Sequence, residues 1–144
     1  MKKFVFILIF CLSSLSFIHV EPSKDRTPTF INEPPSRENV YKACKMYKIE
    51  HPEIVVAQSL LETGHYKSKQ CTEHNNLFGL YDSKNKRYYR FDHWIHSVIA
   101  YKQKVQYKYK GGDYYQFLER IGYAEDPSYI EKVKTIQKRI QNDI

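Results

Sequence analysis

Glu62 is the residue of this sequence whose type and position most clearly suggest chemistry. It follows the mostly apolar stretch 54–61 and lies two residues before Gly64, a residue type that commonly ends helices. In the last turn of a partly buried helix, desolvation and the negative end of the helix dipole both raise the pKa of a carboxyl group. A carboxylic acid that keeps its proton near neutral pH is suited to protonating a leaving oxygen, such as that of a glycosidic bond. The alternative is an exposed glutamate with an ordinary pKa.

Asp82 and Asp92 are candidates for a second acidic group, because they are the only carboxylates of the segment 79–92. Two carboxyl groups about 6.5–9.5 Å apart hydrolyse glycosides with inversion, and groups about 5 Å apart do so with retention. The sequence does not give this separation. As alternatives, Asp82 is a turn residue and Asp92 is the N-cap of the next helix.

Cysteines and histidines offer two further pairs of reactive side chains. Cys44 and Cys71 are a candidate disulfide in an oxidising compartment, and two separate buried thiols are the alternative. His93 and His96 have a spacing that suits a metal ligand pair, but no third ligand accompanies them. We therefore expect no metal and no other cofactor.

The element that positions Glu62 is predicted to be a helix from Pro52 to Gly64, because proline favours the first helical position and glycine the end. A preceding helix begins at Ser36, a suitable N-cap, and extends to about Tyr47. Alternating apolar residues on both sides of the polar tetrapeptide 83–86 predict a β-hairpin. The remaining predicted helices run from Trp94 to Gly111–Gly112, from Asp113 to Ile121 with Gly122 as the stop, and from Asp126–Pro127 to the C-terminus. The sum is a single α+β domain, mainly α, with a small β-hairpin lobe.

The N-terminal residues 1–16 are typical of a secretory signal peptide, since two lysines precede an apolar run and a serine-rich end. An uncleaved anchor is the alternative, but the run is shorter than the about 20 residues that a spanning helix needs. Residues 17–35, with four prolines, predict an extended Pro-rich tether, and residues 36–144 the folded domain. We therefore expect an exported protein, periplasmic or extracellular, without stable membrane insertion after processing.

The charge of the chain bears on its partners. The formal net charge is +7, and it falls to +5 when Lys2 and Lys3 are removed with the first 16 residues. The lysines are scattered among tyrosines and form no dense basic block, so we do not expect nucleic acid as a partner. An anionic wall polymer suits this charge better, and we expect a monomer.

Three ordered motifs extend these observations: VAQSLLETG at Val56–Gly64, NNLFGL at Asn75–Leu80 and YAEDPSY at Tyr123–Tyr129. They resemble glycoside hydrolase family 73, the peptidoglycan endo-β-N-acetylglucosaminidases of the flagellar-muramidase and autolysin type. The resemblance covers residues 38–142. It implies a lysozyme-like domain that binds peptidoglycan glycan strands. It also implies hydrolysis of the β-1,4 bond between N-acetylglucosamine and N-acetylmuramic acid.

The resemblance also implies roles for single residues. Glu62 matches the general acid of the family's E-[ST]-G motif. Tyr123 matches a tyrosine that faces the sugar next to the scissile bond, where it would position an N-acetyl group, and a core aromatic is the alternative. Gly79 allows close backbone approach, and Asn76 either contacts substrate or braces its turn. The residues that the resemblance places at the substrate are Asn76, Phe78, Gly79 and Tyr129.

One departure from the family concerns the second catalytic group. Family members often carry a glutamate on the hairpin, and this hairpin has none. Asp82, Asp92 and a substrate-assisted route through the acetamido oxygen of the sugar all stay open. Two other functions also stay open: a lytic transglycosylase, which forms an anhydro-sugar with one acid, and an inert peptidoglycan-binding module.

Overall fold

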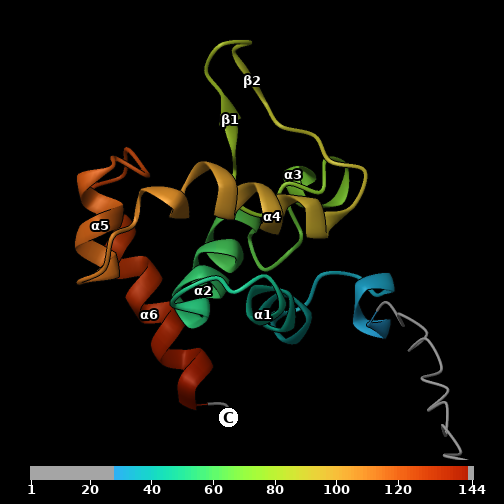
Figure 1. The fold of residues 1–144 in the computed structure, drawn as a ribbon, viewed down its shortest axis with the longest axis horizontal. Helices are drawn as coiled ribbons and strands as arrows, with labels where there is room; N and C mark the ends of the chain where they lie inside the picture. Colours follow the sequence, from blue (N-terminus) through green and yellow to red (C-terminus); the bar gives the residue numbers. More distant parts are fainter. Residues whose placement is uncertain (1–27, 143–144) are drawn as a thin grey trace, which may run out of the picture.

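The computed structural model describes residues 28–142 of the 144-residue chain. The predicted signal peptide 1–16 and residues 17–27 of the predicted tether lie outside the described residues. Figure 1 shows a group of helices around a central one, with a hairpin projecting from one end. The elements in chain order are η1 (Thr29–Asn32), α1 (Arg37–Met46), α2 (Pro52–Thr63), α3 (Lys69–Thr72), β1 (Tyr81–Asp82), β2 (Arg87–Tyr88), α4 (Trp94–Lys104), η2 (Gln106–Lys108), α5 (Tyr114–Arg120) and α6 (Tyr129–Asn142).

The central helix α2 lies between α1 and α6, and it packs most extensively against α6 (Figure 1). It is central because residues 54–60 are buried on every side of the helix, as expected for a helix that is apolar all round. Pro52 starts it, and Gly64 ends it in the left-handed conformation, with the His65 N–H donating to the Leu60 carbonyl. Both predicted ends are confirmed, and Glu62 lies in the last turn.

The predicted fold class, mainly α with a small hairpin lobe, is confirmed, but the hairpin is shorter than predicted. Each strand has two residues, and Tyr81 pairs with Tyr88 and Asp82 with Arg87 in antiparallel register. The Tyr89 N–H still donates to the Leu80 carbonyl, but the buried side chain of Asn76 accepts from the Leu80 N–H and donates to the Tyr89 carbonyl, the two groups that a longer ladder would pair with each other.

Two helix bounds differ from the prediction. Helix α4 ends at Lys104 rather than at Gly111–Gly112, because the side chain of Gln106 turns aside to bond both backbone groups of Glu50. Helix α6 begins at Tyr129 rather than at the predicted Asp126–Pro127 start, since the Asp126 carboxylate accepts from Ser128 and closes a turn before the helix.

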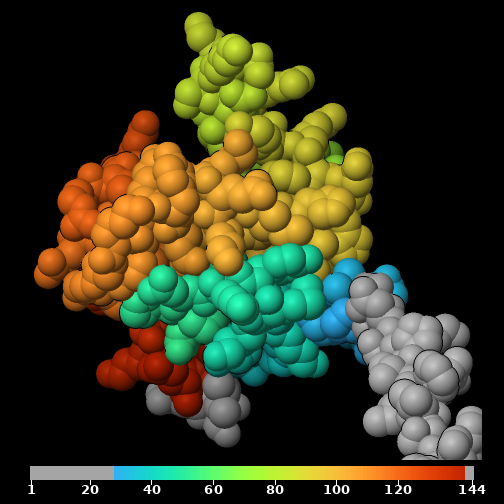
Figure 2. All heavy atoms as spheres, viewed as in Figure 1, coloured from blue at the N-terminus to red at the C-terminus, as the bar shows by residue number. Residues whose placement is uncertain are grey.

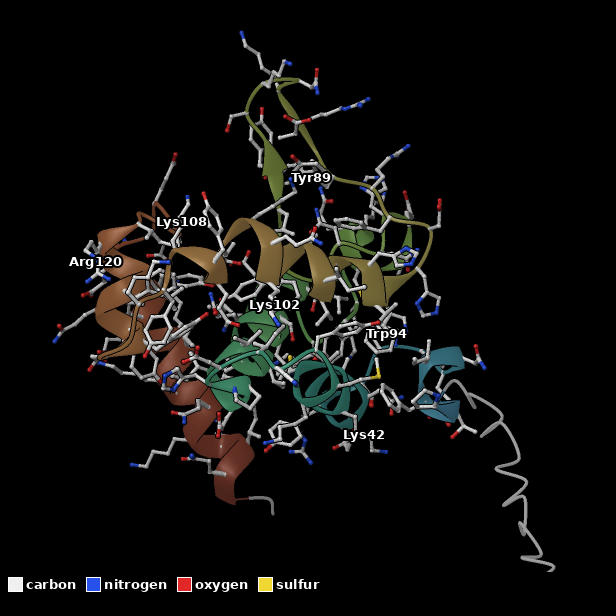
Figure 3. All side chains as sticks on the ribbon, in the orientation of Figure 1. Lys42, Tyr89, Trp94, Lys102, Lys108 and Arg120 are labelled. Atoms are coloured by element: carbon white, nitrogen blue, oxygen red, sulfur yellow. The ribbon has the colours of Figure 1, made fainter. Side chains whose placement is uncertain are left out.

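The segment 29–35 contacts the domain, although it belongs to the predicted extended tether. Phe30 and Ile31 of η1 pack against the core. Trp94, which Figure 3 shows beside this segment, donates its indole N–H to the Glu33 carbonyl at 2.9 Å. Among residues 28–142, no helix combines the length and apolar character needed to cross a membrane.

Candidate active site

Glu62 lies half-buried in the last turn of α2, facing the backbone of Gly79. A Cβ atom built on Gly79 would lie 3.1 Å from Oε2 of Glu62, closer than a comfortable contact. Burial raises the pKa of the Glu62 carboxyl, and a hydrogen bond with Tyr129 partly opposes this. The predicted upward direction of the Glu62 pKa is therefore confirmed. A raised pKa is the direction of shift that suits a general acid.

The turn that carries Gly79 is built by Asn76. The Asn76 amide donates to the carbonyls of Leu80 and Tyr89 at 2.9 and 3.0 Å, and its oxygen accepts from the Leu80 N–H at 2.9 Å. Because both of its N–H groups are used and the side chain is fully buried, Asn76 braces the turn instead of binding substrate. Gly79 follows with φ +59°, a conformation that favours glycine.

Phe78 also has a structural position, not the predicted place at the substrate. Its side chain is 2% exposed and packs 4.5 Å from the ring of Tyr101. The predicted contact between the Phe78 side chain and a sugar is therefore corrected to a core contact. Its backbone carbonyl has a different partner, because it accepts from the Tyr123 hydroxyl at 3.0 Å.

Tyr123 and Tyr129 are brought beside Glu62 by two local structures. Gly122, at φ +61°, ends α5, and the Tyr123 N–H donates to the Leu118 carbonyl at 3.0 Å. Tyr129 is the first residue of α6, and the turn that Asp126 closes immediately before it sets its position. The two tyrosine rings are 5.5 Å apart and tilted. Tyr129 is 7% exposed, so it presents little surface to a sugar, and its hydrogen bond with Glu62 lowers the pKa of that carboxyl.

Neither Asp82 nor Asp92 is among the influences on the pKa of Glu62. The Asp82 carboxylate accepts from the backbone of Lys84 and Asn85 and from the Asn85 side chain, and these bonds lower its pKa. It is therefore held as a turn residue. Asp92 is exposed and does not cap α4, since His93 is the N-cap and its ring accepts from the Ile95 N–H. The predicted N-cap role of Asp92 is wrong.

The cysteine pair and the histidine pair were the two other candidates for reactive side chains. Cys44 and Cys71 are free, buried thiols, so the structure shows the alternative to the disulfide. Burial raises the pKa of Cys44 to about 12, which leaves its thiol unreactive near neutral pH. Within residues 28–142, no group of three or more His, Cys, Asp or Glu side chains is placed to hold a metal ion.

Glu62 is not part of the wall of any of the three cavities described for residues 28–142. A cavity of about 670 Å³ lies elsewhere, between α1, α2 and the end of α6, and its wall does not include Glu62. Figure 2 shows a notch between the projecting hairpin and the α5 end of the molecule. Cleavage of a glycosidic bond needs a carboxyl group with a raised pKa, so we place the candidate active site at Glu62 and not in this cavity.

The comparison with known families decides the membership of the chain. Residues 37–142 match the glucosaminidase family model, described as mannosyl-glycoprotein endo-β-N-acetylglucosaminidase. The chain belongs to glycoside hydrolase family 73. Domains of family 73 are lysozyme-like glycoside hydrolases, and the family implies hydrolysis of peptidoglycan glycan strands, a substrate outside the cytoplasm. No curated protein matches the chain.

The family 73 domain contains one site residue that the sequence analysis missed. Gln58 lies on α2 one turn before Glu62, is fully buried, and donates from its side-chain nitrogen to the Tyr129 hydroxyl at 3.1 Å. The signal was available, because a glutamine inside an apolar helix must find a buried hydrogen-bond partner. The identity of that partner depends on the packing of α6 against α2, which the sequence does not show.

Proposed function

We propose that this family 73 domain hydrolyses the β-1,4 bond between N-acetylglucosamine and N-acetylmuramic acid in peptidoglycan, with Glu62 as general acid. The observation that carries the proposal is the half-buried Glu62 carboxyl, which lies against Gly79 and has a raised pKa. Burial raises the pKa of the carboxyl and so favours its protonated form, and the glycine brings backbone close to it without a side chain in between. A sugar oxygen next to this carboxyl receives its proton as the bond to the anomeric carbon breaks.

The second half of the reaction fits a substrate-assisted route best. The pKa of Glu62 responds to burial and Tyr129, and no second carboxylate of residues 28–142 is among its influences. Asp82 is held by its turn. In this route the acetamido oxygen of N-acetylglucosamine attacks the anomeric carbon while Glu62 gives its proton to the leaving oxygen. Water then opens the cyclic intermediate, and Glu62 takes the proton back from that water.

The site of action follows from the substrate. Peptidoglycan lies outside the cytoplasm, so we propose export to the periplasm or beyond, with residues 1–16 as the signal peptide. The positive charge of the domain suits an anionic wall, and the half-exposed tyrosines 81 and 88 add polar aromatic surface near the notch. The protein acts on glycan strands as a monomer and needs no cofactor in this proposal.

The test is digestion of purified peptidoglycan by the wild-type protein and by Glu62→Gln, with product analysis by mass spectrometry. We expect new reducing N-acetylglucosamine ends, and a loss of about 10²- to 10⁴-fold in the variant, as for removal of a general acid. Glu73→Gln is the matched control, because Glu73 is exposed on the surface. Products with 1,6-anhydro ends would indicate a transglycosylase, and equal binding without turnover by both proteins would indicate a binding module.

The stereochemical course is tested separately. Substrate assistance predicts that the new reducing sugar first appears in the β configuration of the original bond, followed by ordinary mutarotation. Proton NMR of the anomeric signals during digestion measures this. An initial α product would replace the acetamido route by direct attack of water and would require a second base.

A further inference from the structure

A row of buried polar side chains runs through the core and ends at Glu62. Its far end is Gln106, whose oxygen accepts from the Glu50 N–H at 3.1 Å and whose nitrogen donates to the Glu50 carbonyl at 2.9 Å. Both ends of this amide are thus fixed by the backbone of one residue, Glu50. The orientation of Gln106 is set by the backbone, and its second N–H points away from Glu50 to Tyr114, at 3.4 Å from the hydroxyl.

The direction of each following hydrogen bond is then determined. Tyr101 donates to Gln58 Oε1 at 2.7 Å, and the hydroxyls of Tyr101 and Tyr114 are 2.9 Å apart. A hydroxyl has one proton, so Tyr101 cannot donate to Tyr114 as well, and Tyr114 is the donor to Tyr101. Gln58 accepts with its oxygen and donates with its nitrogen to the Tyr129 hydroxyl at 3.1 Å.

The members of this row are shielded from water. No water molecule therefore donates or accepts in place of one of these side chains. Tyr101 and Gln58 are 0% exposed and Tyr114 is 2% exposed. Burial also raises the pKa of Tyr101, Tyr114 and Tyr129, so their hydroxyls keep their protons. Every side chain from Gln106 to Tyr129 therefore donates toward the same end.

Tyr129, which accepts from Gln58, has its own proton left for the other side, where Glu62 and Tyr123 lie. The Tyr123 hydroxyl donates its only proton to the Phe78 carbonyl, so it does not donate to Glu62. A neutral carboxyl group accepts best at its carbonyl oxygen and carries its proton on the other oxygen. A fixed donor at one oxygen of Glu62 thereby assigns the proton to the oxygen that Tyr129 does not contact.

We propose that Gln58 is a positioning residue for the acid: backed by Tyr101, Tyr114 and Gln106, it holds Tyr129 as a donor to Glu62 and so fixes which carboxyl oxygen carries the transferable proton. This inference rests on the proposed function of Glu62. The same bond stabilises the carboxylate after proton transfer, because a charged acceptor strengthens it. The row therefore acts on the chemical step rather than on substrate binding.

The principal test compares Gln58→Met and Tyr129→Phe with the wild-type protein on purified peptidoglycan. Both changes keep the volume and weaken or remove the bond to Glu62. We expect kcat to fall about tenfold with KM unchanged, since one directional charged hydrogen bond is lost. We also expect the alkaline limb of the pH profile to move to higher pH, because the hydrogen bond from Tyr129 lowers the pKa of Glu62.

A second measurement keeps the test valid if Gln58→Met folds poorly. Tyr101→Phe removes one hydroxyl three hydrogen bonds away from Glu62 and leaves the ring in place, and a smaller change of the same sign is expected. Titration of ¹³C-labelled Glu62 by NMR, without substrate, reports its pKa in each variant. Tyr123 and Tyr129 are the titratable groups beside Glu62, and their raised pKa values keep them neutral in this range.

Gln137→Met is the matched control, because Gln137 accepts from Tyr115 at 2.8 Å in the same kind of Gln–Tyr bond between α5 and α6. It should leave the pH profile and the Glu62 pKa unchanged. If the Glu62 pKa and the kcat of Gln58→Met, Tyr101→Phe and Tyr129→Phe all equal those of the wild-type protein, the positioning role is overturned. This holds even if Glu62→Gln is inactive. If Glu62→Gln is as active as wild type, the proposed function itself fails.

Discussion

The two sides of the candidate site are built in opposite ways. On one side, α2 and the first residue of α6 hold Glu62 through buried side chains whose hydrogen bonds all have partners. On the other side, the hairpin has two residues in each strand, and its tip, residues 83–88, is exposed throughout. The acid belongs to the rigid side, where packing fixes its position.

This difference assigns different roles to the two sides. The hairpin contributes its base, where Asn76 and Gly79 form a braced turn against Glu62. Its tip contributes exposed cations, and Tyr88 forms an edge-to-face ring pair with Tyr81 of β1, 5.2 Å apart. In Figure 3, Tyr89 lies at the base of the hairpin, above α4. Function should therefore be sensitive to changes at the base of the hairpin and tolerant of changes at its tip.

The largest loss of activity that distinguishes the two sides is expected from Gly79→Ala, which changes the base of the hairpin. The added Cβ meets Oε2 of Glu62 at 3.1 Å, and φ of +59° strains any residue with a side chain. Displacement of the carboxyl by a fraction of an ångström should lower kcat/KM about tenfold to a hundredfold. Peptidoglycan digestion at equal folded concentration measures this.

Gly111→Ala is the control for backbone strain alone. Gly111 also has a positive φ, +99°, but nothing lies within 4 Å of its added Cβ. It should lower thermal stability without lowering the activity of the folded protein. Equal activity losses in the two variants would mean that strain, and not contact with Glu62, explains the result at Gly79.

The sequence predicted the acid side better than the hairpin side, for physical reasons. Pro52 and Gly64 are local signals, so they gave the ends of α2 and the place of Glu62 in its last turn. The hairpin length depended on Asn76, whose amide competes with the strands for the backbone of Leu80. A competition between a side chain and a ladder does not appear in an alternating pattern of apolar residues.

The candidate site shows the same limit. Glu62 and Gly79 were found because a motif contains them, and their contact agrees with the expected close approach of backbone. Phe78 and Asn76 belong to the same motif but face the core and the turn, so a shared motif did not imply a shared face. Gln58 was missed because its partners come from α4 and α6, which tertiary packing alone brings to α2.

A smaller effect, on stability, is expected from Glu62→Gln. Burial raises the pKa of Glu62 above 4.5, so the folded protein holds this proton to higher pH than the unfolded chain does. Stability is then lost as pH rises from 4.5 through the folded pKa, because ionisation favours the unfolded chain. Glutamine does not ionise, so the variant should melt a few degrees above wild type at neutral pH.

The pH dependence is the decisive part of this measurement. Below pH 4.5 the glutamate is protonated in both states, and the melting temperatures of wild type and variant should converge. Scanning calorimetry from acid to neutral pH measures the gap. A difference in melting temperature that stays constant with pH would show that Glu62 ionises alike in the folded and unfolded states. The pKa of Glu62 would then not be raised by folding.

The smallest effect is expected from Asp82→Asn, at the end of β1 next to the tip of the hairpin. Asn keeps an oxygen that accepts from the backbone N–H groups of Lys84 and Asn85, so the turn should persist. Activity should stay within about threefold of wild type, since the carboxylate serves the turn and not the reaction. Asp92→Asn, at an exposed position before α4, should behave in the same way.

If either aspartate were a general base, its variant would instead lose activity by about 10²-fold or more, and the acidic limb of the pH profile would shift. Such a loss at one aspartate alone would show that the hairpin reaches over Glu62 when glycan binds, and would replace the substrate-assisted route by a two-carboxylate one.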